Sequence, residues 1–332
     1  MAPPLYPALY EINTRVWLGE LSRRPGRPAT FDDVPDEALD RIAGLGFDWV
    51  WLLGVWQTGP AGRAVSRTHP DLLPEYPRVL PDLTDDDITG SPFAIRDYVV
   101  HTDFGGDEAL RRLRARLAGR GVKLMLDFVP NHTAPDHRWA WEHPEYYVQG
   151  TEEDLEREPG DFGRIATARG SAVLARGRDP YFPGWPDTLQ LNYRHAAFRD
   201  AMMAELGRIA SACDGLRCDM AMLVLPEVFA RTWGDRARPA DATEPVDESF
   251  WPGAIAAVRR RHPDFLFLAE AYWDLEWNLQ QLGFDQTYDK RLYDRLRALD
   301  PPATRGHLHA EFGFQARSAR FLENHDEPRA AA

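Results

Sequence analysis

The stretch GDEALRRLRARLAGRGVKLMLDFVP, residues 106–130, joins two patterns of different period. Its first part has acidic residues early, arginines late and a glycine at its close, which predicts a helix from Gly106 to Gly121. Its second part, Val122 to Pro130, is a nearly continuous apolar run, as expected for a strand buried on both faces of a parallel sheet. A helix followed at once by such a strand is typical of α/β folds.

The same alternation continues in both directions along the chain. Further strands are predicted at Tyr10–Leu18, Asp48–Trp56, Gly215–Met220, Phe265–Tyr272, Phe284–Asp289 and Arg320–Asn324. Further helices are predicted at Asp36–Gly46, His195–Ala212, Phe250–Asp264, Asp274–Gly283 and Lys290–Leu299. This alternation favours a (β/α)8 TIM barrel over an open α/β sheet. No glycine-rich nucleotide-binding fingerprint follows any of these strands, which also weakens the open-sheet alternative.

One segment, residues 133–193, breaks this rhythm. It has no long helical pattern, but it contains a charged run from Glu152 to Asp161 and a Pro-Gly-Trp turn at 183–185. A simple loop of this length is uncommon in a compact domain. We therefore predict three parts: residues 1–132 as the first part of the barrel, 133–193 as a small inserted B domain after the third strand, and 194–332 as the rest of the barrel through its seventh strand.

The composition argues against several functional classes. The chain has 332 residues, a net charge of −13 and a pI of about 5.3. Nucleic-acid binding needs clustered Lys and Arg, so no nucleic-acid partner is expected. The sequence contains neither an apolar run of membrane-spanning length nor a signal-peptide pattern, which predicts a cytoplasmic protein with no membrane partner. Two cysteines, Cys213 and Cys218, are too few for a disulfide framework.

Polar side chains follow four of the predicted strands. They are Asp127, Asn131 and His132 on the third strand, Arg217 and Asp219 on the fourth, Glu270 on the fifth, and Asn324, His325 and Asp326 on the seventh. Any one of them alone is explained by a helix cap, a turn or a structural histidine. In a barrel, however, the carboxyl ends of all strands meet at one rim, which is where the active site lies. So many acids at that rim predict an active site.

Two of these carboxylates can divide the work of glycoside hydrolysis, in which one acts as an ionised nucleophile and the other as a proton donor. Arg217 precedes Asp219 by two residues on a strand, so both side chains point to the same face and the guanidinium is expected to lower the pKa of Asp219. Glu270 follows the apolar run FLFLA, a setting that raises a carboxyl pKa. These environments predict Asp219 as the nucleophile and Glu270 as the acid, with Asp326 as a third carboxylate that holds sugar hydroxyls.

Several motifs around these residues resemble those of glycoside hydrolase family 13, the α-amylase family. They are SPFAIRDY (91–98), DFVPNH (127–132), LQLNY (189–193), GLRCDMA (215–221), LAEAYW (268–273) and ENHD (323–326), in the family's order and over nearly the whole chain. The resemblance implies cleavage of α-glucosidic bonds in α-glucans or oligosaccharides, by double displacement with retention. It implies Asp219 as nucleophile, Glu270 as general acid/base and Asp326 as the carboxylate that stabilises the transition state.

The resemblance also implies which residues bind the substrate and whether a metal is needed. We assign substrate binding to Arg217, His132, His325, Phe93 and Asp127. Phe93 stands where many members have a tyrosine that stacks on the sugar, and phenylalanine can also stack. Asn131 matches a calcium ligand of the family, but residues 220–225, MAMLVL, lack the Lys-His pair whose histidine supplies a backbone ligand. We therefore expect no cofactor and no metal.

Other functions remain compatible with these residues. A transglycosylase of the same family would pass the glycosyl group to another acceptor in place of water. Acids at a barrel rim can also hold Mg²⁺, as in enolase-type lyases, although Arg217 and the two histidines fit sugar binding better. A catalytically impaired glucan-binding fragment is a further alternative. It arises because the sequence ends in FLENHDEPRAAA, and we expect an eighth strand and a C-terminal β-domain in the parent protein.

Overall fold

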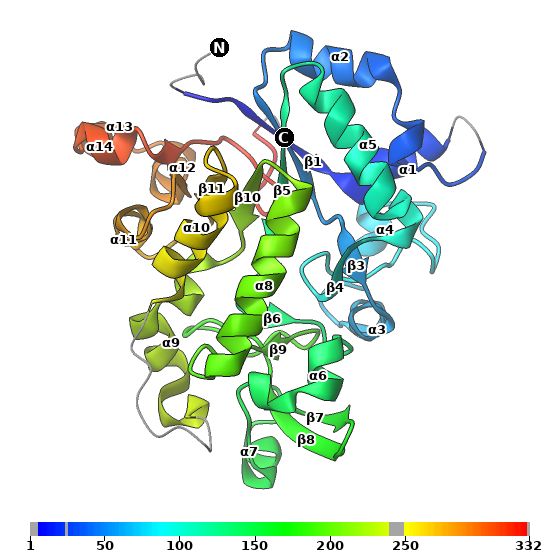
Figure 1. The fold of residues 1–332 in the computed structure, drawn as a ribbon, viewed down its shortest axis with the longest axis vertical. Helices are drawn as coiled ribbons and strands as arrows, with labels where there is room; N and C mark the ends of the chain where they lie inside the picture. The colour runs from blue at the N-terminus through cyan, green and yellow to red at the C-terminus, as the bar shows by residue number, and fades with distance from the viewer. Residues whose placement is uncertain (1–5, 24–25, 239–248, 331–332) are drawn as a thin grey trace.

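A curled sheet of seven parallel strands forms the centre of the structure, a computed structural model that describes residues 6–23, 26–238 and 249–330 (Figure 1). In spatial order the strands are β1 (Leu9–Asn13), β2 (Trp49–Leu53), β5 (Lys123–Phe128), β10 (Gly215–Cys218), β11 (Leu266–Ala269), β12 (Gln286–Tyr288) and β13 (Ser318–Ala319). All neighbouring pairs are parallel. Because their spatial order follows their order in the chain, as in a TIM barrel, the predicted fold class is confirmed.

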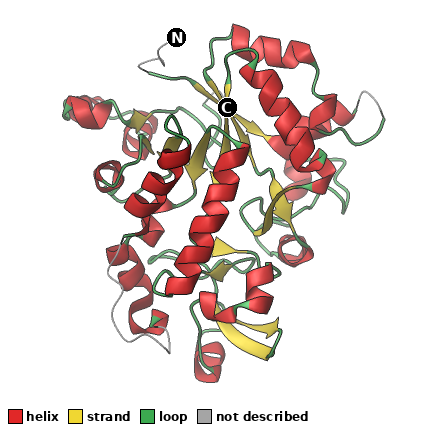
Figure 2. Ribbon diagram, viewed as in Figure 1, coloured by secondary structure: helices red, strands yellow, loops and turns green. Residues whose placement is uncertain are grey.

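Helices connect these strands and cover the outer side of the sheet (Figures 1 and 2). They are α1 (Thr14–Ser22), α2 (Asp36–Gly44), α5 (Gly106–Ala118), α8 (Ala196–Ala212), α9 (Pro226–Trp233), α10 (Phe250–Arg261), α11 (Glu276–Gln281), α12 (Lys290–Arg297), α13 (Pro301–Leu308) and α14 (Phe312–Gln315). The long helix α8 packs beside α10. It begins where the ring of His195 accepts a hydrogen bond from the backbone N–H of Phe198.

Two predicted strands differ most from the observed ones. The first strand ends at Asn13, well before the predicted Leu18, because the Asn13 side chain accepts a hydrogen bond from the N–H of Val16 and starts α1. The seventh strand lies at Ser318–Ala319, just before the predicted range Arg320–Asn324. In that range, the side-chain oxygen of Asn324 accepts hydrogen bonds from the backbone N–H groups of Asp326 and Glu327 and so closes a turn.

The inserted segment forms small sheets of its own at one end of the molecule (Figure 2). Its elements are β6 (His132–Thr133), α6 (Arg138–Glu142), α7 (Glu152–Arg157), β7 (Phe162–Thr167), β8 (Gly170–Ala175) and β9 (Leu189–Gln190). Strands β6 and β9 pair with each other, so the segment leaves the barrel and returns to it at adjacent points. The division into 1–132, 133–193 and 194–332 stays a prediction, and residues 1–5, 24–25, 239–248 and 331–332 of those ranges lie outside the described residues.

A second elaboration, between β2 and α5, is missing from the sequence-based prediction. It contains β3 (Trp56–Thr58), α3 (Pro60–Thr68), α4 (Tyr76–Val79) and β4 (Ile95–Val100). Strands β3 and β4 pair antiparallel with an irregular register. This connection carries Phe93 to the rim of the barrel, so it bears directly on the site.

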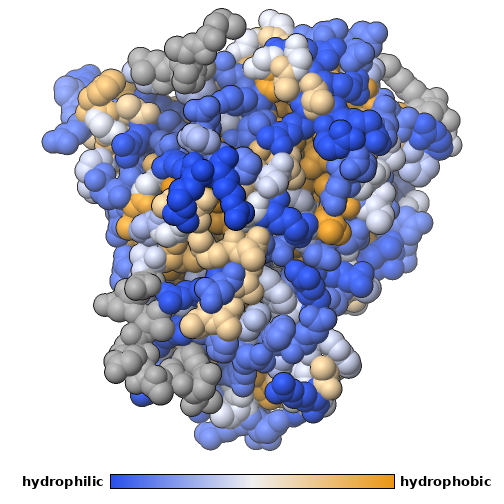
Figure 3. All heavy atoms as spheres, viewed as in Figure 1, coloured by the Kyte–Doolittle hydropathy of each residue, from blue (hydrophilic) through white to orange (hydrophobic). Residues whose placement is uncertain are grey.

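Aromatic and aliphatic side chains share the core on both sides of the sheet. On the inner side Trp49, Trp51 and Leu53 of β2 pack with Met125, Leu268 and Tyr288. Each such side chain, when buried, stabilises the fold by about 1.5–3 kcal/mol. The face shown in Figure 3 is largely hydrophilic, with hydrophobic side chains gathered near its centre. Within the described ranges, no helix combines the length and hydropathy needed to cross a membrane.

Candidate active site

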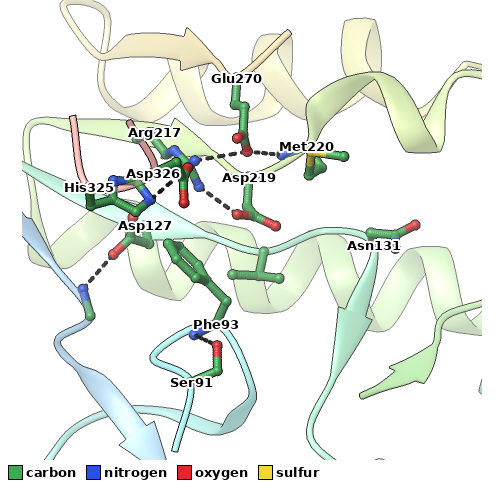
Figure 4. A network of polar contacts seen from close by, with 12 residues as sticks. Ser91, Phe93, Asp127, Asn131, Arg217, Asp219, Met220, Glu270, His325 and Asp326 are labelled. Carbon is green, nitrogen blue, oxygen red and sulfur yellow. Dashed lines mark hydrogen bonds and ion pairs between the residues drawn. The ribbon is translucent and has the colours of Figure 1, made fainter. Parts of the chain in front are cut away.

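Arg217 lies at the centre of the site, and two carboxylates share its charged group (Figure 4). Its side chain, on β10, is 1% exposed. Its Nη1 lies 2.5 Å from Oδ1 of Asp219, and its Nη2 lies 2.8 Å from Oε2 of Glu270. Its Nε donates to the hydroxyl oxygen of Tyr288 on β12 at 3.3 Å. One guanidinium thus brings together the residues predicted as nucleophile and proton donor.

Backbone hydrogen bonds that continue the sheet fix both acids in place. The N–H of Asp219 donates to the carbonyl oxygen of Phe128 at 2.8 Å, and the N–H of Glu270 donates to that of Cys218 at 3.0 Å. Each acid therefore follows its strand without a break in the hydrogen-bond ladder. A site held by rigid strand ends keeps its geometry better than one on a mobile loop.

Burial dominates the electrostatics of the two acids. Burial raises the pKa of Asp219, and the charge of Arg217 opposes that rise without cancelling it. Burial also raises the pKa of Glu270, again against the opposing effect of Arg217. The expectation that Arg217 keeps the pKa of Asp219 low is therefore wrong for the net direction. The reason is that both carboxylates are deeply buried and one guanidinium is divided between them.

Both oxygens of Glu270 also accept hydrogen bonds from residues that the sequence analysis overlooked. The N–H of Met220 donates to Oε2 at 2.7 Å, and the hydroxyl of Tyr272 donates to Oε1 at 2.7 Å. Met220 reaches this position in a left-handed conformation, with φ 42° and ψ 47°, which is uncommon for a residue with a side chain. Tyr272 follows Glu270 by two residues, the same spacing that identified Arg217 beside Asp219, so this signal was available in the sequence.

The third carboxylate, Asp326, differs in being half exposed, with 51% of its side chain accessible. Its Oδ2 lies 3.1 Å from Nε2 of His325, whose Nδ1 lies 2.6 Å from Oε1 of Glu11 on β1. Although burial alone would raise it, the pKa of Asp326 is lowered by its contact with the charged ring of His325. Asp326 is therefore a stable anion at the edge of the site.

Two further residues predicted to bind substrate lie on either side of this centre. The ring of Phe93 lies 5.6 Å from that of His325 and 5.2 Å from the guanidinium carbon of Arg217. His132 is buried against the edge of Trp185, and its burial lowers its pKa to about 4. His132 is therefore a neutral hydrogen-bonding group at neutral pH.

Asp127 lies beneath the other residues and away from the cavity. Its carboxylate accepts the indole N–H of Trp51 at 2.9 Å and the N–H of Gly54 at 2.7 Å, and it is 1% exposed. Burial raises its pKa to about 6, despite the opposing charge of Arg217. This placement fits a residue that supports Arg217 from below, and direct contact between Asp127 and a substrate would require the site to open.

A cavity of about 740 Å³ joins these residues. Of the predicted residues, its walls include Arg217, Asp219, Glu270, Asp326, His132, His325 and Phe93. The inserted segment adds Trp185 and Thr188, and the β3–β4 connection adds a wall from Val65 to Gly90. No element or site residue is predicted from the sequence for residues 57–90, so this second wall appears only in the structure. Concave sites of this size, with convergent polar groups, are typical of small-molecule binding.

The residues around Asn131 do not fit a calcium ion. The side-chain nitrogen Nε2 of Gln190 lies 2.9 Å from Oδ1 of Asn131, 3.0 Å from the carbonyl oxygen of Asn131 and 3.1 Å from that of Leu191. An amide donor thus stands among three oxygens, where a cation would require carboxylates and shorter contacts. Among the described residues, no group of three or more His, Cys, Asp or Glu side chains is placed to hold a metal.

Sequence comparisons agree with this geometry. The family model of the α-amylase catalytic domain matches residues 36–300. An α-1,4-glucan:maltose-1-phosphate maltosyltransferase of Burkholderia pseudomallei (strain K96243) is 29% identical over 272 residues, which are 79% of this chain and 19% of that protein. The α-amylase MalA of Haloarcula japonica is 26% identical over 329 residues, which are 97% of this chain and 39% of that protein. The chain thus spans less than two fifths of the length of these relatives.

A solved structure gives the same result. An α-amylase from Lactobacillus plantarum, 25% identical, superposes with a TM-score of 0.63 over 97% of this chain and 64% of that chain. The family model covers well over half of the sequence, and its region contains Arg217, Asp219 and Glu270. The chain therefore belongs to the α-amylase catalytic-domain family, glycoside hydrolase family 13.

Proposed function

We propose that the protein cleaves α-glucosidic bonds of α-glucans or oligosaccharides with retention of configuration. The observation that carries this proposal is the sharing of Arg217 between Asp219 and Glu270, at 2.5 Å and 2.8 Å, on the wall of one cavity. Two carboxyl groups so close to one cation suit a double displacement, in which a covalent intermediate forms on one acid while the other transfers the proton.

Asp219 is the nucleophile in this proposal, and Glu270 carries the proton. Asp219 receives the shorter contact from Arg217, which favours its ionised form. The negative charge of Asp219 in turn raises the pKa of Glu270 beyond the effect of burial. In the first step the carboxylate of Asp219 attacks the anomeric carbon, and Glu270 protonates the departing oxygen. In the second step Glu270 takes a proton from the incoming acceptor, whose oxygen displaces Asp219.

The remaining wall residues hold the sugar during these steps. Asp326, anionic and half exposed, is placed to accept sugar hydroxyl groups and to favour the positive charge that develops on the ring. Neutral His132 offers a further hydrogen bond, and Phe93 offers an apolar face. Supporting evidence for a glucan comes from the names of the relatives, which include an α-amylase and maltosyltransferases.

A transglycosylase is the second candidate, because several of the similar curated proteins are maltosyltransferases. Both activities share the intermediate on Asp219 and differ only in the acceptor, which is water in one case and a sugar or phosphate in the other. The cytoplasmic location and the independence from cofactors stay predictions beside this proposal.

One experiment separates these possibilities. The purified chain is incubated with maltooligosaccharides or trehalose, and with maltose 1-phosphate plus a maltooligosaccharide acceptor, and the products are identified by chromatography. Shorter sugars indicate hydrolysis, and elongated oligosaccharides indicate transfer. Binding of maltooligosaccharides without any product would support the impaired glucan-binding alternative and contradict our proposal.

A further inference from the structure

Glu11 is an acidic residue of the site that neither the motifs nor the resemblance identified. It lies on β1, at one end of the sheet order, whereas His325 follows β13 at the other end. Their side chains meet, with Oε1 of Glu11 2.6 Å from Nδ1 of His325. The contact joins residues that are 314 positions apart in the sequence. It is a specific link between the first strand and the loop that carries Asp326.

We propose that Glu11 is a positioning residue: it binds Nδ1 of His325 and thereby holds the ring with Nε2 aimed at Asp326. This inference rests on the proposed function, because Asp326 is useful to a reaction only if the cavity takes a sugar. Glu11 acts through His325 and is not itself among the residues that line the cavity.

The geometry requires a charged imidazole. Each ring nitrogen of His325 faces a carboxylate oxygen, at 2.6 Å on the Glu11 side and 3.1 Å on the Asp326 side. A neutral ring has one nitrogen with a lone pair, and that lone pair would face a negative oxygen. Nδ1 forms a hydrogen bond with Glu11, whereas Nε2 and Asp326 are in ion-pair contact without hydrogen-bond alignment, and a protonated Nε2 is the form that the charge of Asp326 favours. Glu11 thus fixes both the orientation and the charge of His325.

The surroundings of the ring agree with this arrangement. The ring packs against the edge of Trp51, at 5.5 Å, and against Phe93, at 5.6 Å, so the ring cannot turn freely. The groups that act on its charge are Glu11 on β1, Asp326 beside it and Arg217 on β10. Burial and Arg217 favour the neutral ring, but the contacts with Asp326 and Glu11 outweigh them and raise the pKa of His325 to about 9.

The consequence for the reaction concerns charge balance in the cavity. The carboxylates of Asp219, Glu270 and Asp326 face the same space, and Arg217 is already divided between two of them. A positively charged His325 offsets the third. Without Glu11 the pKa of His325 would fall, although Asp326 would still raise it, so the ring would lose its positive charge beside Asp326 at a lower pH.

The direct test is a titration of His325 that does not depend on catalysis. Histidine ring nitrogens are labelled with ¹⁵N, and their NMR signals are followed from pH 5 to pH 10, with His325 identified by the signal missing in His325→Gln. In the wild-type chain we expect a midpoint near 9. In Glu11→Gln we expect it to fall by about one pH unit or more, a tenfold loss of proton affinity. The same midpoint in both proteins would overturn the proposal.

Matched variants guard against a general loss of structure. Glu20→Gln makes the same chemical change at an exposed position on α1 and is expected to leave the midpoint unchanged. Glu11→Asp keeps the charge on a shorter side chain and is expected to give an intermediate midpoint, so it serves if Glu11→Gln does not fold. A Glu11→Asp midpoint identical to that of the wild type, together with an unfolded Glu11→Gln, would also overturn the proposal.

Activity gives a second readout. With an α-glucosyl fluoride donor, Glu11→Gln is expected to lower kcat/KM more at pH 8 than at pH 6, because the variant loses its imidazolium over that range. An equal loss at both pH values would contradict a role through the charge of His325. A wild-type chain that shows no turnover would contradict the proposed function, whereas the titration would still decide the role of Glu11.

Discussion

The buried pair of acids around Arg217 and the half-exposed acid at the rim use the same chemical group in opposite ways. Asp219 and Glu270 have 8% and 5% of their side chains exposed, and burial raises the pKa of both. Asp326 has 51% exposed, and His325 lowers its pKa. Burial thus sets the direction of the pKa shift for the two deep acids, whereas the charge of His325 sets it for Asp326. In our proposal the buried pair supplies the nucleophile and the proton carrier, and Asp326 supplies a fixed negative charge at the rim.

The largest expected effect comes from the buried pair. Asp219→Asn keeps the shape of the side chain but removes the nucleophile, so we expect turnover of α-glucosides to fall by roughly a thousandfold or more. Product formation measured by chromatography, beside Asp264→Asn as an exposed control, checks this. An Asp219→Asn protein with full activity would rule out the assignment.

Removal of the shared cation tests the buried pair through stability. Arg217→Met leaves Asp219 and Glu270 buried without their partner, and breaking a buried ion pair in this way typically costs about 3–5 kcal/mol. Urea unfolding measured by circular dichroism gives the free energy of unfolding directly. Arg297→Met, at a mostly exposed position on α12, is expected to change it little. Equal stability of both variants would contradict a buried, ionised Asp219 paired with Arg217.

The rim is tested by the pH dependence of stability. The pKa of His325 is about 9 in the folded chain against an ordinary value of 6.5, so its contribution to stability is fully present below pH 6.5 and is lost as the pH rises through 9. The difference in unfolding free energy between the wild type and His325→Gln should therefore shrink over that range. His309→Gln, an exposed control, should show no such trend. A constant difference would contradict the charged ring.

The smallest expected effect concerns the response of Tm to calcium, at a place outside both regions where the side-chain amide of Gln190 donates to nearby oxygens. We propose that Gln190 takes the place of a cation, since its Nε2 faces three oxygens near Asn131. Neither calcium nor a chelator should move the Tm of the wild type. Gln190→Asp restores an acidic oxygen, so millimolar Ca²⁺ should raise its Tm by roughly 2 °C or more, unlike the exposed Gln149→Asp. A wild-type Tm that falls with chelator would refute this.

The sequence was sufficient to locate the ends of the strands that carry Asp219 and Glu270, because each apolar run is short and an acid follows it directly. Asp219 and Glu270 could be placed beside Arg217 from the spacing of two residues and the order of parallel strands alone. The same spacing of two residues separates Tyr272 from Glu270, so their contact could also have been predicted from the sequence. These contacts follow from local geometry and the topology of the barrel.

Other contacts could not be predicted, because they depend on distances between segments that lack a shared period. Glu11 meets His325 only after the sheet has curled, and Gln190 meets Asn131 only after the inserted segment has returned to the barrel. The predicted direction of the pKa shift of Asp219 is wrong, because burial depth depends on the whole folded chain and not only on residues that are near in sequence. The wall from Val65 to Gly90 was missed for a similar reason, since an irregular connection carries no periodic pattern.

The central claim, that Asp219 is the nucleophile of a retaining reaction, is tested most directly by trapping the intermediate. The chain is incubated with a 5-fluoro-α-glucosyl fluoride, which slows hydrolysis of a glycosyl-enzyme, and is then digested and analysed by mass spectrometry. Our account predicts one fluoroglucosyl group on the peptide that contains Asp219, and none in Asp219→Asn. A label on Glu270 or Asp326, or turnover of the reagent with no labelled peptide, would contradict it.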